Sequence, residues 1–172
     1  MGPRFSRFVL ALAALVAAAA PATASERYDP RLRFRTISTP HFDIHFHQGG
    51  EGEARRLASI AEQVRREMAP TLGLPNGRVQ VILVDQHDSP NGWVTPFPYN
   101  VIELTAAAPR GGSLIGNTRD WLRLVFVHEY THVLHLDRSR GLFAAGRRIF
   151  GRHPLALPNV FPPPWQIEGI AT

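Results

Sequence analysis

The sequence predicts an α+β fold in which a mixed β-sheet packs on a long apolar helix. Residues 41–47 alternate strictly between apolar and polar side chains, and this period of two is typical of a half-buried strand. Residues 51–68 repeat apolar side chains at helical spacing and carry acidic residues at their start. Residues from Asn117 or Thr118 to Asp137 are apolar on nearly every side, which indicates a buried helix.

The remaining elements follow from turn residues and short apolar runs. We expect further strands at residues 33–37, 79–85 and 100–105, a short helix at 142–150, and a last helix at 165–172. Pro70 and Gly73 end the first helix, and residues 88–98 and 109–116 form loops rich in Pro, Gly or Asn. Residues 138–164 are otherwise irregular, and loops of this length usually have a function or are partly helical. The predicted elements follow the order of two strands, a helix, two strands and then helices, which is typical of an α+β fold.

The first 24 residues have the layout of a secretory signal peptide. Arg4 and Arg7 precede an apolar run at residues 8–20, and residues 22–24 read Ala-Thr-Ala, a small-residue cleavage site. The run is shorter than the roughly 20 residues that span a bilayer, so an uncleaved anchor is the less favoured alternative. We expect one mature domain at residues 25–172, no membrane span after cleavage, and a periplasmic or extracellular location.

The composition excludes several classes of protein and of site. All 19 basic residues are arginine, and the net charge of +5 falls to +3 when Arg4 and Arg7 are removed with the signal peptide. The arginines are scattered in pairs and no nucleic-acid motif accompanies them, which predicts no nucleic-acid binding. The chain has no cysteine, so disulfides and thiolate metal sites are excluded. A metal would be held by histidine and carboxylate, as in catalytic zinc sites.

Residues 128–132 read His-Glu-Tyr-Thr-His, the H-E-x-x-H pattern. On a helix, His128 and His132 lie one turn apart with Cβ atoms about 5–6 Å from each other. Both rings can then reach one zinc ion at about 2.0–2.1 Å, and Glu129 can act as general base on a zinc-activated water. Residues 124–127 also have strand propensity, but a strand would separate the histidines by roughly 13 Å, too far for one ion.

A catalytic zinc needs a third protein ligand, for which Glu168 is the best candidate. It lies in the last predicted helix, and packing of that helix against the motif completes a two-histidine, one-glutamate set. His135 is the competing candidate, but on a continuous helix it lies about 10 Å along the axis from His128. No glycine between His132 and His135 would redirect it, so we interpret His135 as a packing or second-sphere residue.

Other polar residues have simpler explanations. His41, Asp43, His45 and His47 share one side of a predicted strand, and such a row is more often its solvated face than a metal site. Asp137 is interpreted as a polar residue at the end of a helix rather than as support for the metal ligands. The alternative for the motif itself is a buried helix with satisfied histidines. Three polar residues within an apolar helix are costly unless they are paired or coordinated, which favours a metal.

The sequence resembles the gluzincin metallopeptidases, in particular bacterial peptidase MA-like domains. The resemblance is carried by residues 128–137, HEYTHVLHLD, and residues 164–171, PWQIEGIA, with weaker similarity at residues 39–46 and 91–104. It implies a zincin-like fold in which His128, His132 and Glu168 ligate Zn²⁺ and Glu129 is the base. It also implies that the strand at residues 100–105 is the sheet edge along which an extended peptide lies.

The implied function is that of an exported zinc metallopeptidase acting on peptide or protein substrates. The alternative is a non-catalytic envelope module, for binding or scaffolding, with a structural or vestigial zinc site. Gluzincins normally continue past the third ligand into a helical subdomain, and exported members often carry a downstream β-propeller. Only four residues follow Glu168 in this sequence. We therefore expect residues 25–172 to be a truncated domain that can be inactive alone.

Overall fold

The computed structural model describes residues 28–85, 91–107 and 120–171. The chain divides into two units, residues 1–31 and residues 32–172. In the first unit the Asp29 carboxylate accepts hydrogen bonds from the backbone N–H and the guanidinium of Arg31. The predicted signal peptide, residues 1–24, lies outside the described residues.

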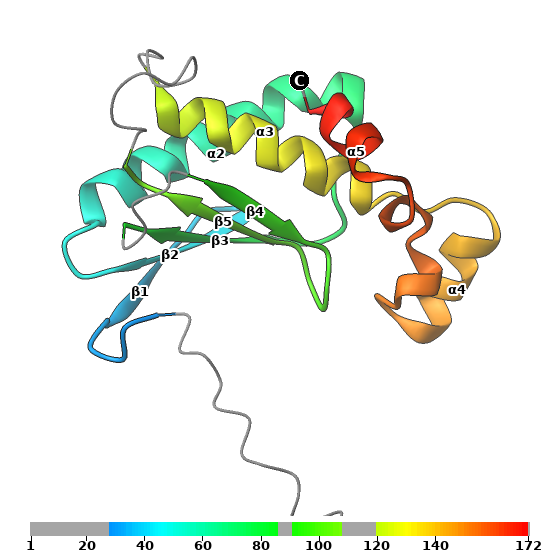
Figure 1. The fold of residues 1–172 in the computed structure, drawn as a ribbon, viewed down its shortest axis with the longest axis horizontal. Coiled ribbons are helices and arrows are strands. Elements are labelled where there is room, and N and C mark those ends of the chain that lie inside the picture. Colours follow the sequence, from blue (N-terminus) through cyan, green and yellow to red (C-terminus); the bar gives the residue numbers. More distant parts are fainter. Residues whose placement is uncertain (1–27, 86–90, 108–119, 172) are drawn as a thin grey trace, which may run out of the picture. The chain divides into compact units, whose positions relative to one another are not determined.

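The second unit is an α+β domain with a mixed sheet of five strands among its described residues (Figure 1). The strands are β1 (Phe34–Ser38), β2 (Phe42–His47), β3 (Val79–Val84), β4 (Gly92–Thr95) and β5 (Val101–Thr105), in the order β1-β2-β3-β5-β4. The central strands β2, β3 and β5 are parallel, and β1 and β4 flank them antiparallel. The predicted fold class is confirmed at this level.

Strand β4 is the element that the sequence prediction missed. Residues 88–98 were expected to be a loop. The strand within them, β4, has only four residues and begins with glycine, so it is too short to show an alternating pattern. The presence of β4 also shows that the expected place of residues 100–105 at the sheet edge is wrong. β5 lies between β3 and β4, paired with β3 on one side and with β4 on the other. The edge strand on this side is therefore β4.

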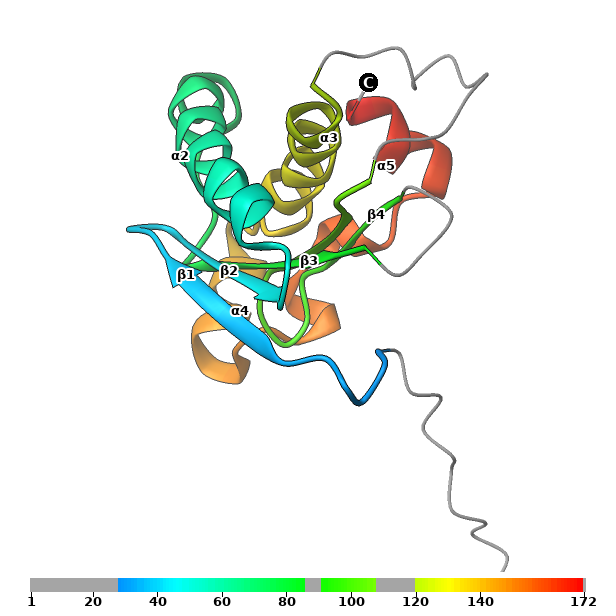
Figure 2. The same ribbon diagram turned by 90° about the vertical axis from the view of Figure 1, so that its left-hand side faces the viewer.

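Two long helices, α2 (Glu51–Leu72) and α3 (Trp121–Leu136), cover the same face of the sheet (Figures 1 and 2). α2 continues past Pro70, where we expected it to end, because a proline in the last turn removes only one backbone donor. α3 begins after Asp120, whose side chain accepts a hydrogen bond from the Arg123 N–H. The predicted N-caps, Asn117 and Thr118, lie outside the described residues.

Helix α3 is fixed on the sheet by a cluster of aromatic rings. Phe42 of β2 contacts Phe126 and Tyr130 of α3, with ring centroids 5.7 and 5.6 Å apart, and all three side chains are fully buried. The alternation predicted for residues 41–47 is confirmed, since Phe42, Ile44 and Phe46 face this core. At its start α3 is also tied to β5, because the Trp121 indole donates to the Thr105 carbonyl at 3.2 Å. These buried ring contacts and this hydrogen bond fix the position of the helix that carries the motif on the sheet.

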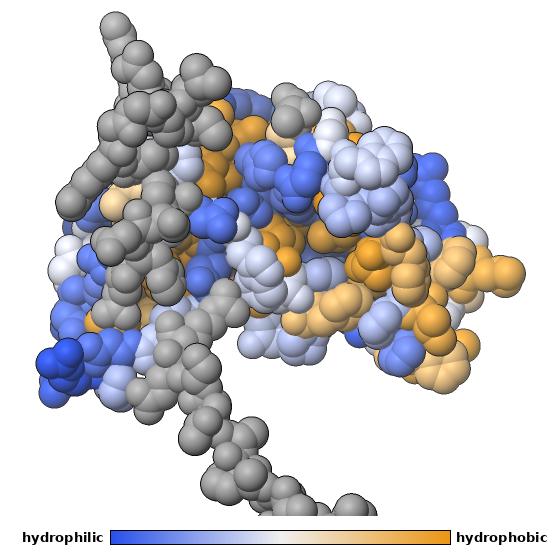
Figure 3. Space-filling model, viewed as in Figure 1, coloured by the Kyte–Doolittle hydropathy of each residue, from blue (hydrophilic) through white to orange (hydrophobic). Residues whose placement is uncertain are grey.

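The chain then passes through α4 (Leu142–Phe150) and two short 3₁₀ turns before α5 (Pro164–Ile170), which returns to lie beside α3 (Figures 1 and 2). Apolar side chains are exposed over α4 and the turns, visible as the orange area in Figure 3. Leu142 is 90% exposed, and Ile149, Phe150 and Leu155 are also exposed. None of the described helices is both long and apolar enough to span a membrane.

Candidate metal centre

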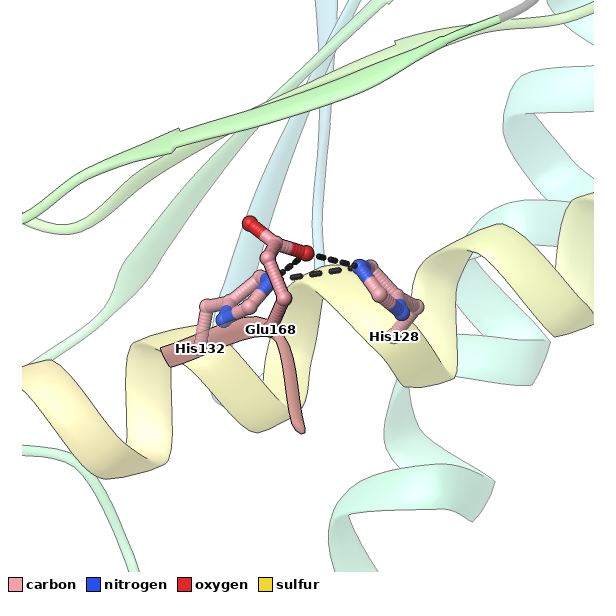
Figure 4. A group of neighbouring side chains, drawn as sticks. All are labelled: His128, His132 and Glu168. Carbon is pink, nitrogen blue, oxygen red and sulfur yellow. Dashed lines mark hydrogen bonds and ion pairs between the residues drawn. The ribbon is translucent and has the colours of Figure 1, made fainter. Parts of the chain in front are cut away.

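Three predicted ligand residues converge at one point between α3 and α5 (Figure 4). His128 and His132 lie one turn apart on α3, and their Nε2 atoms are 3.1 Å apart. Glu168 approaches from α5 and places Oε2 3.4 Å from the His128 Nε2 and 3.6 Å from the His132 Nε2. Two histidines of α3 and a glutamate 36 positions after the second of them thus present three donor atoms to a common centre.

The spacing of these donor atoms fits a zinc ion. Ligands about 2.0–2.1 Å from a tetrahedral zinc lie about 3.3 Å from one another. The three observed separations, from 3.1 to 3.6 Å, bracket that value. Two imidazole nitrogens and one carboxylate oxygen are also a donor set that catalytic zinc uses, with one position left for water. His128, His132 and Glu168 are the only such group of potential metal ligands within the described ranges.

Glu129 lies beside this centre and is shielded from solvent. Its side chain is buried on the cleft side of α3, next to the start of β4. Burial, and secondarily the negative charge of Glu168, raise the pKa of Glu129 to about 7. Two carboxylates that face one cleft repel each other, and a divalent cation between them would relieve that repulsion.

The environment of His132 favours the neutral imidazole that coordinates metals. Burial lowers the pKa of His132, the nearby rings of His128 and His135 act in the same direction, and the Glu168 carboxylate opposes them. A neutral ring keeps a lone pair on the nitrogen that points at the centre. Its other nitrogen, Nδ1, is buried and has no hydrogen-bond partner among the described residues. None of the described residues therefore gives the His132 ring the outer hydrogen bond that ligating histidines usually have.

A cleft of about 240 Å³ opens over the three ligands. One wall is β4 with the residue before it, Asn91–Val94; the floor is α3, and α5 contributes Ile167 and Glu168. The predicted peptide-binding strand, residues 100–105, does not line the cleft, because β4 stands between β5 and the open side. Sequence reasoning missed β4 as a wall of the site, and the only signal for it was the weak similarity at residues 91–104.

His41, just before β2, and His45 and His47 of β2 do not form a metal-ligand group with any other described residue. His41 pairs with Glu62 at 2.8 Å, and His45 hydrogen-bonds Thr36 and Gln80. His47 pairs with Asp85 at 2.7 Å and is buried, so it does not belong to a solvated face as expected. The interpretation of the row as structural is supported, because each ring has partners within the sheet or its flanking helix.

Two polar residues follow the motif on α3, His135 within the helix and Asp137 at its end. His135 does not join the ligand group. Asp137 does lie at the end of α3, as expected, but it is only 2% exposed and pairs with Arg147 and Arg152, so it is more than a simple polar residue at a helix end. Its partners lie 10 and 15 positions further along the chain, where no local pattern links them to it.

Comparison with known proteins gives no independent identification. No protein-family model matches the chain, and no curated protein is significantly similar to it in sequence. The assignment of a function therefore depends on the geometry of the site and on the motifs that carry the resemblance.

Proposed function

We propose that this protein is a zinc metallopeptidase of the gluzincin type. The observation that carries the proposal is the convergence of His128, His132 and Glu168 on one point, with the buried carboxylate of Glu129 next to it. A structural zinc site uses four protein ligands and has no need of a neighbouring base. Three ligands, a base and an open cleft are together the requirements of metal-assisted hydrolysis.

In the proposed chemistry the metal supplies Lewis acidity and Glu129 transfers protons. Zinc, when bound, supplies Lewis acidity that makes a water acidic and polarises the scissile carbonyl. Glu129 takes the proton from the attacking water and later delivers it to the leaving amine. The support for this role is that Glu129 lines the same cleft as the three ligand residues.

The edge strand β4 offers a place for the substrate. β4 pairs with β5 on one side, and no described strand lies on its other side. An extended peptide can add to such an edge through main-chain hydrogen bonds, so that a scissile bond would lie over α3. We therefore propose β4 for the substrate-binding role that the resemblance implied for residues 100–105.

Substitution of Glu129 and His132 tests the proposal. Glu129→Gln is expected to bind zinc as the wild type does and to lose hydrolysis of a casein or peptide-library substrate, because only the base is removed. His132→Ala is expected to lose the metal, measured as bound zinc per chain by atomic absorption. Full activity of Glu129→Gln would refute the mechanism, and unchanged zinc content of His132→Ala would refute the ligand set. Zinc binding without hydrolysis in the wild type would favour the non-catalytic module.

We also propose that the protein is exported through the signal peptide at residues 1–24. The support is the order of a positive start, an apolar run and the Ala-Thr-Ala site. N-terminal sequencing of protein recovered from a Gram-negative periplasm should give a chain that begins near Ser25. A chain that keeps its first residues and stays in the cytosol would contradict the proposal.

A further inference from the structure

The third ligand is held by a helix that makes little contact with the rest of the domain. α5 has seven residues and none of its side chains is buried. The Glu168 side chain is 62% exposed, whereas that of His132 is 8% exposed. Packing of α5 itself therefore contributes little, within the described residues, to holding Glu168 within 3.6 Å of both histidine nitrogens. The chain segment that leads to α5 is the part of the described structure that can fix its position.

That segment is anchored by a buried ion cluster at the end of α3. One oxygen of Asp137, Oδ1, accepts Arg147 Nη2 at 2.6 Å and Arg152 Nη2 at 3.0 Å, and the other accepts the Asn76 N–H at 2.6 Å. Both arginine side chains are mostly buried, 13% and 14% exposed. A buried carboxylate with two guanidinium partners strongly favours the conformation that keeps all three together.

The same segment also satisfies the last carbonyls of α3. Arg147 donates through Nη1 to the Asp137 carbonyl at 2.7 Å, and Asn159 donates its amide to the His135 carbonyl at 2.7 Å. Carbonyls at the end of a helix have no partner within the helix and attract cationic donors. The segment is therefore bound to the C-terminus of the motif helix at two points, through Arg147 of α4 and through Asn159 of the second 3₁₀ turn.

Arg152 extends the cluster to the hairpin that forms the cleft wall. Its Nη1 donates to the Pro96 carbonyl at 3.0 Å and to the Asn100 Oδ1 at 2.9 Å, between β4 and β5. Between Arg152 and Asn159, Leu157 is fully buried and adds an apolar anchor. The cluster thus joins the motif helix, the β4–β5 hairpin and the segment before α5, the three parts that surround the metal centre.

We propose that Asp137 is a positioning residue, which holds residues 138–164 through Arg147 and Arg152 so that α5 presents Glu168 to the metal. The inference rests on the proposed zinc site. Asp137 does not line the cleft that holds the metal ligands. In this role it increases the fraction of molecules in which the Glu168 carboxylate lies close enough to His128 and His132 to share a metal ion with them. The apparent dissociation constant of a site varies inversely with that fraction.

The first test is a double-mutant cycle on zinc affinity, measured by competition with a chromophoric chelator. Asp137→Asn should weaken zinc binding about 10-fold, and by no more than Glu168→Ala does. In the Glu168→Ala background, Asp137→Asn should have no further effect, because no third ligand remains to be positioned. Arg147→Gln, which leaves Arg152 paired with Asp137, should give a smaller loss and serves if Asp137→Asn does not fold.

Asp43→Asn is the matched control. Asp43 is also a carboxylate paired with an arginine, Arg78 at 2.7 Å, but it lies on β2 and outside the metal cleft. The same chemical change there should lower stability without changing zinc affinity. An equal loss of affinity in both variants would show a general effect of destabilisation and overturn the proposal.

A second readout needs no metal. In zinc-free protein, trypsin should cleave after Arg147 and Arg152 faster in Asp137→Asn than in the wild type or in Asp43→Asn, because the segment is released. Unchanged cleavage, or a loss of zinc affinity that persists in the Glu168→Ala background, overturns the positioning role. A wild type that binds no zinc instead refutes the proposed function, and the cleavage pattern then still decides whether Asp137 holds the segment.

Discussion

Gly92, the first residue of β4, lies directly against the carboxylate of Glu129. A Cβ atom added at residue 92 would overlap the Cγ, Cδ and Oε1 atoms of the Glu129 side chain. The edge strand can therefore approach the proposed base this closely only because residue 92 has no side chain. Gly92 and Glu129 both line the cleft over the ligand residues, so this contact lies in the proposed site.

This relationship predicts that Gly92→Ala impairs catalysis more than it impairs metal binding. The new methyl group must push Glu129 aside or widen the cleft, and displacement of a catalytic group by about 1 Å can reduce the rate about 100-fold. The three atoms nearest to the added Cβ all belong to Glu129, so we expect the main displacement there and a zinc affinity within about 2-fold of the wild type. Steady-state kinetics and chelator competition on the same preparation measure the two effects.

Gly52→Ala is the control for this change. Residue 52 lies in the first turn of α2, where an added Cβ meets no atom within 4 Å. Both kcat and zinc affinity should be unchanged in Gly52→Ala. If Gly92→Ala were as active as Gly52→Ala, the close approach of β4 would have no bearing on the position of the base.

Zinc should stabilise the fold through the same three ligands. A ligand present at 100 times its dissociation constant stabilises the native state by about 2.7 kcal/mol, which raises the melting temperature by roughly 5–10 °C for a domain of this size. The increase should be reversed by EDTA and should be absent in His132→Ala. A thermal shift of equal size in His132→Ala would place the bound zinc elsewhere, for example at the histidines of β2.

The site was predictable to the extent that it is local. His128, Glu129 and His132 lie on one helical turn, so their spacing alone indicates a common centre. Glu168 could be proposed because a catalytic zinc needs a third ligand and this glutamate lies on a second predicted helix, but its approach depends on a folded segment with no periodic pattern. The burial of Asp137 was not predicted for the same reason, since it depends on arginines from that segment.

The fold shows the same division between local and non-local information. Long elements such as α2 and β2 were predicted nearly to their ends, because their periodicity extends over many residues. β4 is four residues long and is a strand because β5 lies beside it. The order of strands in the sheet, and with it the edge of the cleft, is set by this pairing and not by any pattern within residues 92–95.

Asp43 should make stability depend on pH in the acid range. Hydrogen bonds from Arg78, in the first place, and from Gln80 and Ser38 hold the pKa of Asp43 well below its usual range, although burial opposes them. A carboxyl group with a depressed pKa stabilises the fold above its unfolded pKa of about 3.9, and this stabilisation is lost as the pH falls toward the folded value. The protein should therefore lose stability progressively below about pH 4.

Asp43→Asn isolates this contribution. Because Arg78 is partly exposed, we expect the variant to lose only about 1 kcal/mol of unfolding free energy at pH 7. The difference from the wild type should shrink below about pH 4, because Asp43 then takes up a proton in the unfolded wild type while it stays ionised in the folded protein, and this lowers the stability of the wild type alone. Urea denaturation at several pH values measures it. A difference that stays constant down to pH 2 would mean that the loss does not come from the charge of Asp43.

Tyr130, within the motif, carries a hydroxyl group that the core does not satisfy. The side chain is fully buried, and its hydroxyl has no hydrogen-bond partner among the described residues. Burial, as the largest cause, raises the pKa of Tyr130 to about 12. The ring itself is well packed, stacked on Phe126 with centroids 5.6 Å apart and 12° between the planes. The packing of the ring and the burial of the hydroxyl thus have opposite effects on stability.

Tyr130→Phe should therefore stabilise the protein by about 1 kcal/mol, because a buried hydroxyl without a partner is removed while the ring contacts remain. Zinc affinity should not change, since Tyr130 packs against Phe42 and Phe126 on the core side of α3, away from the metal ligands. Tyr130→Ala, in contrast, should lose about 3–5 kcal/mol through the cavity it leaves. Urea midpoints for the three proteins test both statements. Destabilisation of Tyr130→Phe would show that the hydroxyl has a partner in the folded protein.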